Sequence, residues 1–321
     1  MSTEAGGKRG GGEARRYSYV QMDVFTERRL EGNALAVFTD ARGLSDAEMQ
    51  AVARETRLSE TTFVFPREPK VEREHGVRVR IFTTEEELPF AGHPTLGTAF
   101  ALRGPDRRSA GGGALRARSG AAEIVLDLEV GKVPVTFTNT EAGGGQVFGE
   151  MRQVDPAMGE IHSREDIARV AGLELEDIAT DLPIQTVSTG VAFAIVPLAT
   201  RKAAEKLALD WKRVAEYTER REAKFLYFVT RECVDREARL HARMIFYNGE
   251  DPATGSAAGC AAAWMVENGV AQADERVLIE QGLEAQRPSR IFVRAGKEGD
   301  RVVNVRVGGH AVEAMRGELF L

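Results

Sequence analysis

Apolar and polar side chains alternate along several short stretches of this chain, and the alternation predicts β-strands. The clearest case is Val-Arg-Val-Arg-Ile at 77–81, where the apolar side chains would lie on one face of a strand and the arginines on the other. Strands are in the majority among the expected elements. They are predicted at residues 19–25, 34–39, 61–65, 77–83, 123–128, 132–138, 187–196, 225–230, 238–246, 290–294 and 302–307.

Helices are fewer, and capping residues mark where they start. Residues 45–48 hold Ser and Glu at capping-box spacing, and 163–172 and 200–209 are shorter helices of the same kind. Two further segments, 94–102 and 256–267, are rich in small and apolar residues and carry little charge. A helix that is apolar on all sides is a buried helix, so each of these two is expected to lie inside a layer of strands.

The two apolar helices belong to an internal repeat. Each copy runs from a strand ending in Phe, through an acidic loop and a glycine, to the helix. Phe82 and Phe246 are 164 residues apart, and Gly92 and Gly255 are 163 residues apart. Two copies are too few for a solenoid. The repeat therefore predicts an α+β fold of two similar domains, each with strands wrapped around its own central helix.

Composition suggests the limits of these domains. Residues 1–16 are rich in Gly, Lys, Arg and Glu and are interpreted as a disordered tail, because they hold almost nothing to bury. We expect the first domain at 17–140 and the second at 145–314, with the glycine-rich stretch 143–145 near the boundary. A second glycine-rich stretch, 111–113, is expected to be a loop.

Charge and composition narrow the classes of partner. The chain has 43 basic and 49 acidic residues and a net charge of −6, so no basic surplus exists to neutralise phosphates. The longest apolar run, 257–266, is too short to cross a bilayer, and no signal-peptide pattern follows the first methionine. Cys233 and Cys260 form neither a disulfide framework nor a CxxC motif. We therefore expect a reduced, cytoplasmic protein that binds neither nucleic acid nor membrane.

Motifs of several familiar chemistries are absent from the sequence. It contains no GxSxG, no GxxxxGK[ST], no HExxH and no GxGxxG after a strand. The five histidines are scattered without the spacing of metal ligands. We therefore expect a protein that needs no metal, nucleotide or flavin cofactor.

The acidic loops of the repeat are the strongest candidates for a site. Each ends in a glycine, Gly92 or Gly255, at the start of an apolar helix. A helix N-terminus presents unpaired N–H groups and a partial positive charge, so each is suited to bind a carboxylate or a phosphate. The alternative is that Ser256 is only an N-cap and that the glycines only form turns. Because the glycine and the helix start recur at matching positions in both copies of the repeat, we favour the binding site over this alternative.

Three charged or polar residues near these loops have two interpretations each. His93 either donates to a substrate atom or is a packed or capping histidine. Asp251, before Pro252, either belongs to the site or forms a turn. Glu60 has the position of an ordinary solvated glutamate, but it opens a strand that leads towards the core.

Five motifs follow one another along the chain: Asp-Val-Phe at 23–25, GNALAV at 32–37, Ser-Glu-Thr at 59–61, ELPFAGHPTLG at 87–97 and EDPATGSA at 250–257. Taken in order, they resemble the PhzF (phenazine-biosynthesis isomerase) family, over residues from about 17 to the C-terminal GELFL. The resemblance implies the diaminopimelate-epimerase fold: two pseudo-symmetric domains, each a β-barrel around a central helix, with the site in the cleft between them. It also implies a last strand, near 315–321, that returns to the first domain, and a homodimer.

The resemblance also bears on the reaction. Diaminopimelate epimerase and proline racemase place a cysteine at each helix start, and the matching residues here are Ala91 and Thr254. Because Cys233 and Cys260 lie elsewhere, two-thiol racemisation is effectively excluded. In the isomerase that names the family, the glutamate matching Glu60 takes a proton from one carbon of trans-2,3-dihydro-3-hydroxyanthranilate and returns it to another.

By this likeness Glu60 is the general base and then the acid, while His93 and Asp251 orient the polar groups of a small carboxylate substrate. Ser256 and the backbone amides at the two helix starts would hold the carboxylate of that substrate. The implied site residues are Glu60, His93, Asp251 and Ser256 as catalytic, and Ser59, Gly92, Gly255 and Thr254 as substrate-binding.

Fold does not fix substrate, so the function stays open among three hypotheses. The first is a cofactor-independent isomerase of a small unsaturated or hydroxylated carboxylic acid. The second is a binding or regulatory protein that keeps the fold without chemistry. The third, an epimerase or racemase, requires a second base opposite Glu60 that the sequence does not offer.

Overall fold

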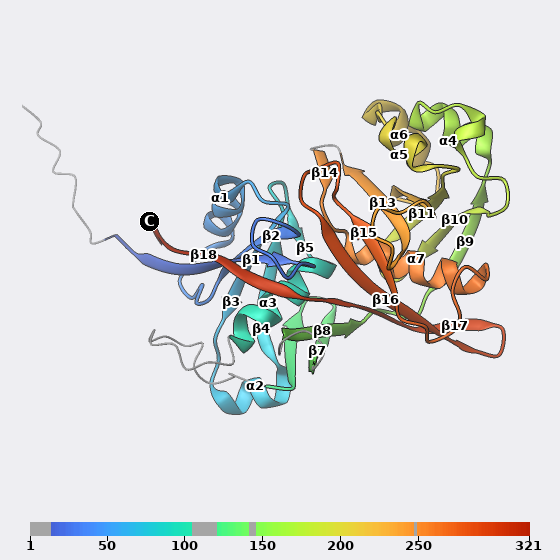
Figure 1. The fold of residues 1–321 in the computed structure, drawn as a ribbon. Helices are drawn as coiled ribbons and strands as arrows, with labels where there is room; N and C mark the ends of the chain where they lie inside the picture. Colours follow the sequence, from blue (N-terminus) through green and yellow to red (C-terminus); the bar gives the residue numbers. More distant parts are fainter. Residues whose placement is uncertain (1–13, 105–120, 141–145, 247–248) are drawn as a thin grey trace, which may run out of the picture.

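The computed structural model describes residues 14–104, 121–140, 146–246 and 249–321. Residues 1–13 of the predicted tail and both glycine-rich stretches, 111–113 and 143–145, lie outside the described residues. The end of the predicted tail is a correction, because Arg16 begins a strand and the backbone of Arg15 is hydrogen-bonded to that of Leu321. Figure 1 shows two lobes joined by long strands of the C-terminal part. The fold is α+β and mostly sheet.

Within the described residues the strands form one hydrogen-bonded network. The strands are β1 (Arg16–Val24), β2 (Asn33–Phe38), β3 (Glu60–Phe65), β4 (Val77–Phe82), β5 (Glu87–Leu88), β6 (Glu123–Leu128), β7 (Gly131–Thr140), β8 (Gln146–Arg152), β9 (Ala157–His162), β10 (Ile184–Ser188), β11 (Ala192–Pro197), β12 (Phe225–Thr230), β13 (Ala238–Phe246), β14 (Gly249–Asp251), β15 (Val277–Gln281), β16 (Ser289–Glu298), β17 (Arg301–Gly309) and β18 (Ala311–Phe320).

Two long buried helices and several shorter peripheral ones complete the described chain. In the part of the chain that the structure covers, no helix has the length and apolar character needed to cross a bilayer. The helices are α1 (Asp46–Thr56), α2 (Pro69–His75), α3 (Gly92–Arg103), α4 (Arg164–Ala171), α5 (Arg201–Glu205), α6 (Trp211–Thr218) and α7 (Gly255–Glu267), with a 3₁₀ turn at Leu175–Asp177.

The strand pairings of the first half recur in the second half. The antiparallel pair β1–β2 is followed by parallel β2–β3, antiparallel β3–β4 and β4–β5, parallel β4–β6, and antiparallel β6–β7 and β7–β8. The same sequence of pairings runs from β10–β11 through β11–β12, β12–β13, β13–β14, β13–β15 and β15–β16 to β16–β17. The repeat seen in the sequence is therefore also a repeat of topology.

Two pairings tie the halves together. β8 pairs with β17, and the last strand, β18, crosses the molecule to pair with β1 along its whole length (Figure 1). Tyr19 lies opposite Gly317, and the pairing continues to Arg15 and Leu321, whose backbone N–H groups each donate to the other's carbonyl. Both ends of the described chain therefore lie in the same pair of strands, β1 and β18.

The central helices are buried as the sequence predicts. Every residue of α3 is buried, as are all residues of α7 except Ser256 and Glu267. α3 packs against β1, β2, β3, β6, β7 and β8, and α7 packs against β10, β11, β16 and β17. Small residues allow these close approaches: a Cβ on Gly97 would lie 2.6 Å from Cγ2 of Val24 and 2.7 Å from Cδ2 of Leu35.

Gly97→Ala is expected to lower the free energy of unfolding by about 1–3 kcal/mol, because the added methyl group overpacks the contact between α3 and the β1–β2 pair. Urea denaturation of the purified variant measures this change. Ala51→Ser, on the exposed face of α1, is the control and should change the free energy by less than about 0.5 kcal/mol. A Gly97→Ala midpoint equal to that of the unmodified protein would contradict the close contact.

Several elements differ from the sequence prediction. The single strand expected at 187–196 is a hairpin of β10 and β11, because Gly190 adopts a φ of +127° and turns the chain. The strands β5, β8, β9, β14 and β15 and the helices α2 and α6 are not predicted from the sequence, and β5 and β14 lie within the two segments expected to be loops. The helix expected at 200–209 ends at Glu205.

Candidate active site

The starts of the two central helices touch each other. A Cβ on Gly92 would lie 3.0 Å from the backbone N of Ser256 and 3.1 Å from the carbonyl carbon of Gly255. The first N–H groups of each helix have no partner within the helix, so both positive helix ends converge on one place. The N-cap residues are Ala91 and Thr254, and neither side chain caps its helix. Ser256 is therefore inside the first turn, and the interpretation of it as an N-cap is wrong.

A glutamate and a histidine meet beside these helix ends. Glu60 is the first residue of β3, and His93 is the second residue of α3. Oε2 of Glu60 lies 3.4 Å from Nδ1 of His93. The side chains are 16% and 4% exposed, respectively. Oε2 of Glu60 and Nε2 of His93 are buried and have no hydrogen-bond partner among the described residues.

Asp251 approaches the same place from the second half of the chain. It ends β14 and is buried. Its Oδ2 accepts from the Thr254 hydroxyl at 2.7 Å. Its Oδ1 accepts from Nδ2 of Asn33 at 2.7 Å and from the Ser59 hydroxyl at 3.4 Å. The structure thus brings together all eight residues expected at the site.

Burial governs the protonation of these groups. Burial, reinforced by the nearby charge of Asp251, raises the pKa of Glu60 well above its usual range. Burial also raises the pKa of Asp251, but hydrogen bonds from Thr254, Asn33 and Ser59 oppose the rise. Burial lowers the pKa of His93 to about 3, against the opposing effect of a hydrogen bond with the Ala34 backbone, so the imidazole is neutral at pH 7.

Two amide side chains at the site carried no expectation from the sequence. Asn33 reaches from β2 to Asp251, and Gln281 reaches from the end of β15 to the same turn. Nε2 of Gln281 donates to the Asp251 carbonyl at 2.7 Å and to the Thr254 hydroxyl at 2.9 Å. Its Oε1 accepts from the Thr254 N–H at 3.2 Å and from the Tyr227 hydroxyl at 2.9 Å. The Gln281 amide therefore bonds to both ends of the segment 251–254, at Asp251 and at Thr254.

The two cysteines are placed away from the helix starts. Cys260 lies in the middle of α7, where burial raises the pKa of its thiol to about 11. Burial raises the pKa of Cys233 to about 12. Both thiols are therefore protonated near neutral pH, and neither occupies the position of Ala91 or Thr254. Among the residues that the structure describes, no cluster of His, Cys, Asp and Glu side chains could hold a metal ion.

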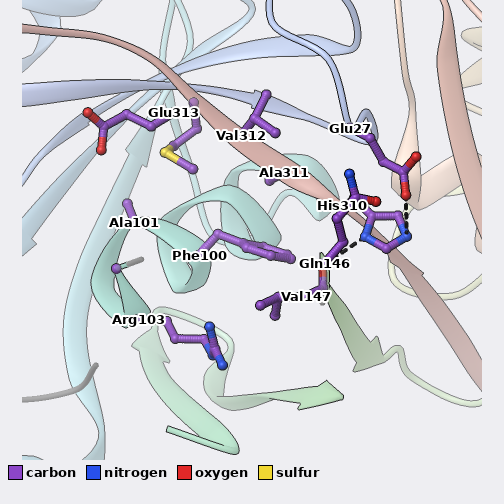
Figure 2. Close-up of a pocket in the computed structure, with 12 residues that line it drawn as sticks. Glu27, Phe100, Ala101, Arg103, Gln146, Val147, His310, Ala311, Val312 and Glu313 are labelled. Atoms are coloured by element: carbon purple, nitrogen blue, oxygen red, sulfur yellow. Dashed lines mark hydrogen bonds and ion pairs between the residues drawn. The ribbon is translucent and has the colours of Figure 1, made fainter. Parts of the chain in front are cut away.

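A cavity of about 200 Å³ lies at the other end of α3 (Figure 2). Phe100 and Arg103 line it, together with β18 residues and His310. In Figure 2 the His310 ring is bonded on both sides: Nδ1 to the Val147 carbonyl at 2.8 Å and Nε2 to Glu27 at 3.3 Å. None of the lining residues belongs to the site at the helix starts.

Sequence comparisons place the chain among isomerases. The family model of phenazine biosynthesis-like proteins, PhzC-PhzF, matches residues 22–317. An uncharacterised isomerase of Mesorhizobium japonicum is 37% identical over 313 residues, which cover 95% of this chain and 99% of the relative. The trans-2,3-dihydro-3-hydroxyanthranilate isomerase of Pseudomonas aeruginosa is 31% identical over 309 residues, which cover 95% and 100%.

Solved structures agree on the fold. A PhzF-family phenazine biosynthesis protein of Bacillus anthracis superposes with a TM-score of 0.83 at 26% identity, over 96% of this chain and 100% of that one. A probable proline racemase of Agrobacterium radiobacter has a TM-score of 0.58 at 11% identity, over 94% and 92%. At that identity the second likeness concerns the fold alone.

Proposed function

Because the chain belongs to the phenazine biosynthesis-like (PhzF) family of isomerases, we propose that it moves a proton between two carbon atoms of a small carboxylic acid. Glu60 would be the group that carries the proton. We further propose that the two halves are pseudo-symmetric domains, each a barrel around its central helix, with this site between them. The repeated strand pairings and the buried α3 and α7 support that arrangement.

The observation that carries the proposal is that the neighbouring carboxyl groups of Asp251 and Glu60 differ in the hydrogen bonds they accept. Asp251 accepts three hydrogen bonds, whereas Oε2 of Glu60 has no partner in the described chain. A glutamate with a raised pKa exchanges its proton near neutral pH and so acts both as acid and as base. Pairs of titratable groups whose environments differ in this way are typical of acid–base sites.

The reaction needs no oxidant or reductant. In the fraction of molecules in which Glu60 has lost its proton, the substrate gives a C–H proton to the Glu60 carboxylate, and the electron pair of that bond shifts along the unsaturated system of the substrate. The Glu60 carboxyl returns a proton to a second carbon, so atoms and charge balance. The first N–H groups of α3 and α7, which have no partner within their helices, are suited to hold the carboxylate of the substrate, and His93 and Asp251 to bond its other polar groups.

The surroundings of Thr254 argue for one base rather than two. A racemase acts with an acid and a base on opposite faces of one carbon, and Thr254 stands where related enzymes have the second group. Its hydroxyl already donates to Asp251 and accepts from Gln281, and a hydroxyl is a weak base. The site therefore favours transfer of a proton between two carbon atoms over inversion of the configuration at one carbon, as in an epimerase.

Proton NMR in D₂O tests the proposal. We expect the purified protein to convert trans-2,3-dihydro-3-hydroxyanthranilate, the compound in the name of the P. aeruginosa relative, or another small unsaturated or hydroxylated acid. Deuterium at the carbon that receives the proton would show that Glu60 exchanges with solvent during turnover. Binding of such acids by the folded protein without any conversion would reject catalysis and leave a binding protein.

A further inference from the structure

We propose that Asn33 is a positioning residue that fixes the negative charge of the site on Asp251 and leaves the proton on Glu60. It acts through the carboxyl groups and not on the reacting atoms. The role of that proton in turnover rests on the proposed function, but the placement of the charge does not.

Asn33 is held firmly between the two halves of the chain. It is the first residue of β2 and is 2% exposed. The preceding Gly32 donates its N–H to the Pro288 carbonyl at 3.0 Å and accepts from Nε of Arg287 at 2.7 Å. Arg287 is itself paired with the buried Asp23 at 2.8 Å. Residues from both halves therefore fix the backbone that carries the amide.

The amide can point in only one direction. Its Nδ2 lies 2.7 Å from Oδ1 of Asp251 and 3.0 Å from the carbonyl oxygen of Ala253. Both neighbours are acceptors, so the NH₂ group and not the carbonyl oxygen of Asn33 must face them. Nδ1 of His93, at 3.4 Å from the same nitrogen, is the third and most distant neighbour. One N–H is thus committed to Asp251.

Hydrogen bonds to a carboxylate favour its ionised form. Asp251 receives three of them and Oε2 of Glu60 receives none from the described residues, although that oxygen is buried as well. Two neighbouring buried carboxyl groups repel each other when both are ionised, so one of them keeps a proton. The hydrogen-bond donors around Asp251 favour its ionised form, so the negative charge lies on Asp251 and the proton stays on Glu60.

No Lys or Arg side chain that the structure describes binds either carboxyl group in competition with Asn33. On the strand of Asp251, Glu250 is held by both Nε and a terminal nitrogen of Arg243, at 2.8 and 2.7 Å. From β12, Tyr227 faces the site and donates to Gln281. From β3 and α3 come Glu60 and the neutral His93, described above. Among the described residues, no Lys or Arg forms an ion pair with Asp251 or Glu60, so neutral donors decide where the charge lies.

Asn33→Ala tests the proposal in a ¹³C NMR titration of protein labelled at the side-chain carboxyl carbons of Asp and Glu. Glu60→Gln and Asp251→Asn identify the two signals. In the unmodified protein Glu60 should keep its proton to a higher pH than Asp251. In Asn33→Ala the midpoint of Asp251 should rise by about one to two pH units, the effect of one hydrogen bond to a charged group, and that of Glu60 should fall.

Asn268→Ala is the matched control. Asn268 also donates from Nδ2 to a backbone carbonyl, that of Trp264 at 2.9 Å, but at the far end of α7. Its loss should leave both midpoints unchanged. Asn33→Ser, which also shortens the side chain, replaces Asn33→Ala if the alanine variant does not fold. Midpoints in the Asn33 variant equal to those of the unmodified protein would overturn the proposal.

The titration also separates this inference from the proposed function, because it needs no substrate. If no acid is converted but the midpoints move as expected, the function fails and the placement of the charge stands. If turnover is found, the limb of the pH–rate profile that belongs to Glu60 should move to lower pH in Asn33→Ala. Turnover with an unmoved limb would overturn the role of Asn33.

Discussion

Glu60→Gln is expected to reduce turnover by about 10²–10⁴-fold, the usual contribution of a general acid–base group. An amide neither accepts nor releases a proton at these pH values, but it fills the same space as the carboxyl group. Because Oε2 of Glu60 is buried without a hydrogen-bond partner in the described chain, the variant should be at least as stable as the unmodified protein. The conversion rate by NMR and the thermal midpoint measure both effects.

Glu55→Gln is the control for this change, because Glu55 lies on the exposed side of α1 and its loss should not alter turnover. A Glu60→Gln protein that still binds the acid but does not convert it would support the proton-carrier role. Undiminished conversion by a folded Glu60→Gln protein would contradict it, and another group would have to move the proton.

His241→Gln is expected to lower the free energy of unfolding by about 3 kcal/mol at pH 6. His241 is fully buried between two glutamates, with Nδ1 3.0 Å from Glu280 and Nε2 3.0 Å from Glu284. Burial alone would lower the pKa of this histidine, but the hydrogen bonds and charges of the two carboxylates raise it to about 9. Replacing it leaves two carboxylates close together without a cation between them.

The loss of stability in His241→Gln should become smaller as the pH rises. Because the folded pKa of about 9 lies above the ordinary value of 6.5, protonation stabilises the fold fully below about pH 6.5 and no longer above about pH 9. Urea denaturation at pH 6 and pH 9.5 should therefore show a difference that shrinks at the higher pH. His75→Gln, at the exposed end of α2, is the control. A loss of equal size at both pH values would contradict a charged His241.

Some of this architecture was predictable from local sequence. The helices α3 and α7 were found because a segment without charge can only be stable inside a core. The start of α1 at Ser45 and the limits of α4 followed from capping residues that act on their own neighbours. His93 and Glu60 drew attention by their place at the start of a helix and of a strand, but only the resemblance to the PhzF family implied a role for Glu60 in the reaction.

Other parts depend on partners that are distant in the sequence. β15 has only three apolar residues, and its polar end, Glu280 and Gln281, is buried because His241 and the Asp251 turn satisfy it. Asn33 stood in a recognised motif, yet its role depends on a bond to Asp251, more than two hundred residues away. A single uncharged asparagine gives no sequence pattern from which its bonding partner could be predicted, so only the folded structure identifies the bond.

The pairing of β1 with β18 determines when the protein can finish folding during its synthesis. A ribosome releases β1 before the whole second half of the fold, but the strand that completes it, with Gly317 opposite Tyr19, is made only after that half. Until then β1 is paired on one edge with β2, and its other edge exposes N–H and C=O groups to any passing strand. Closing so long a loop is also slow, because non-local contacts form late. The first half is therefore translated before the second half but completed only after it.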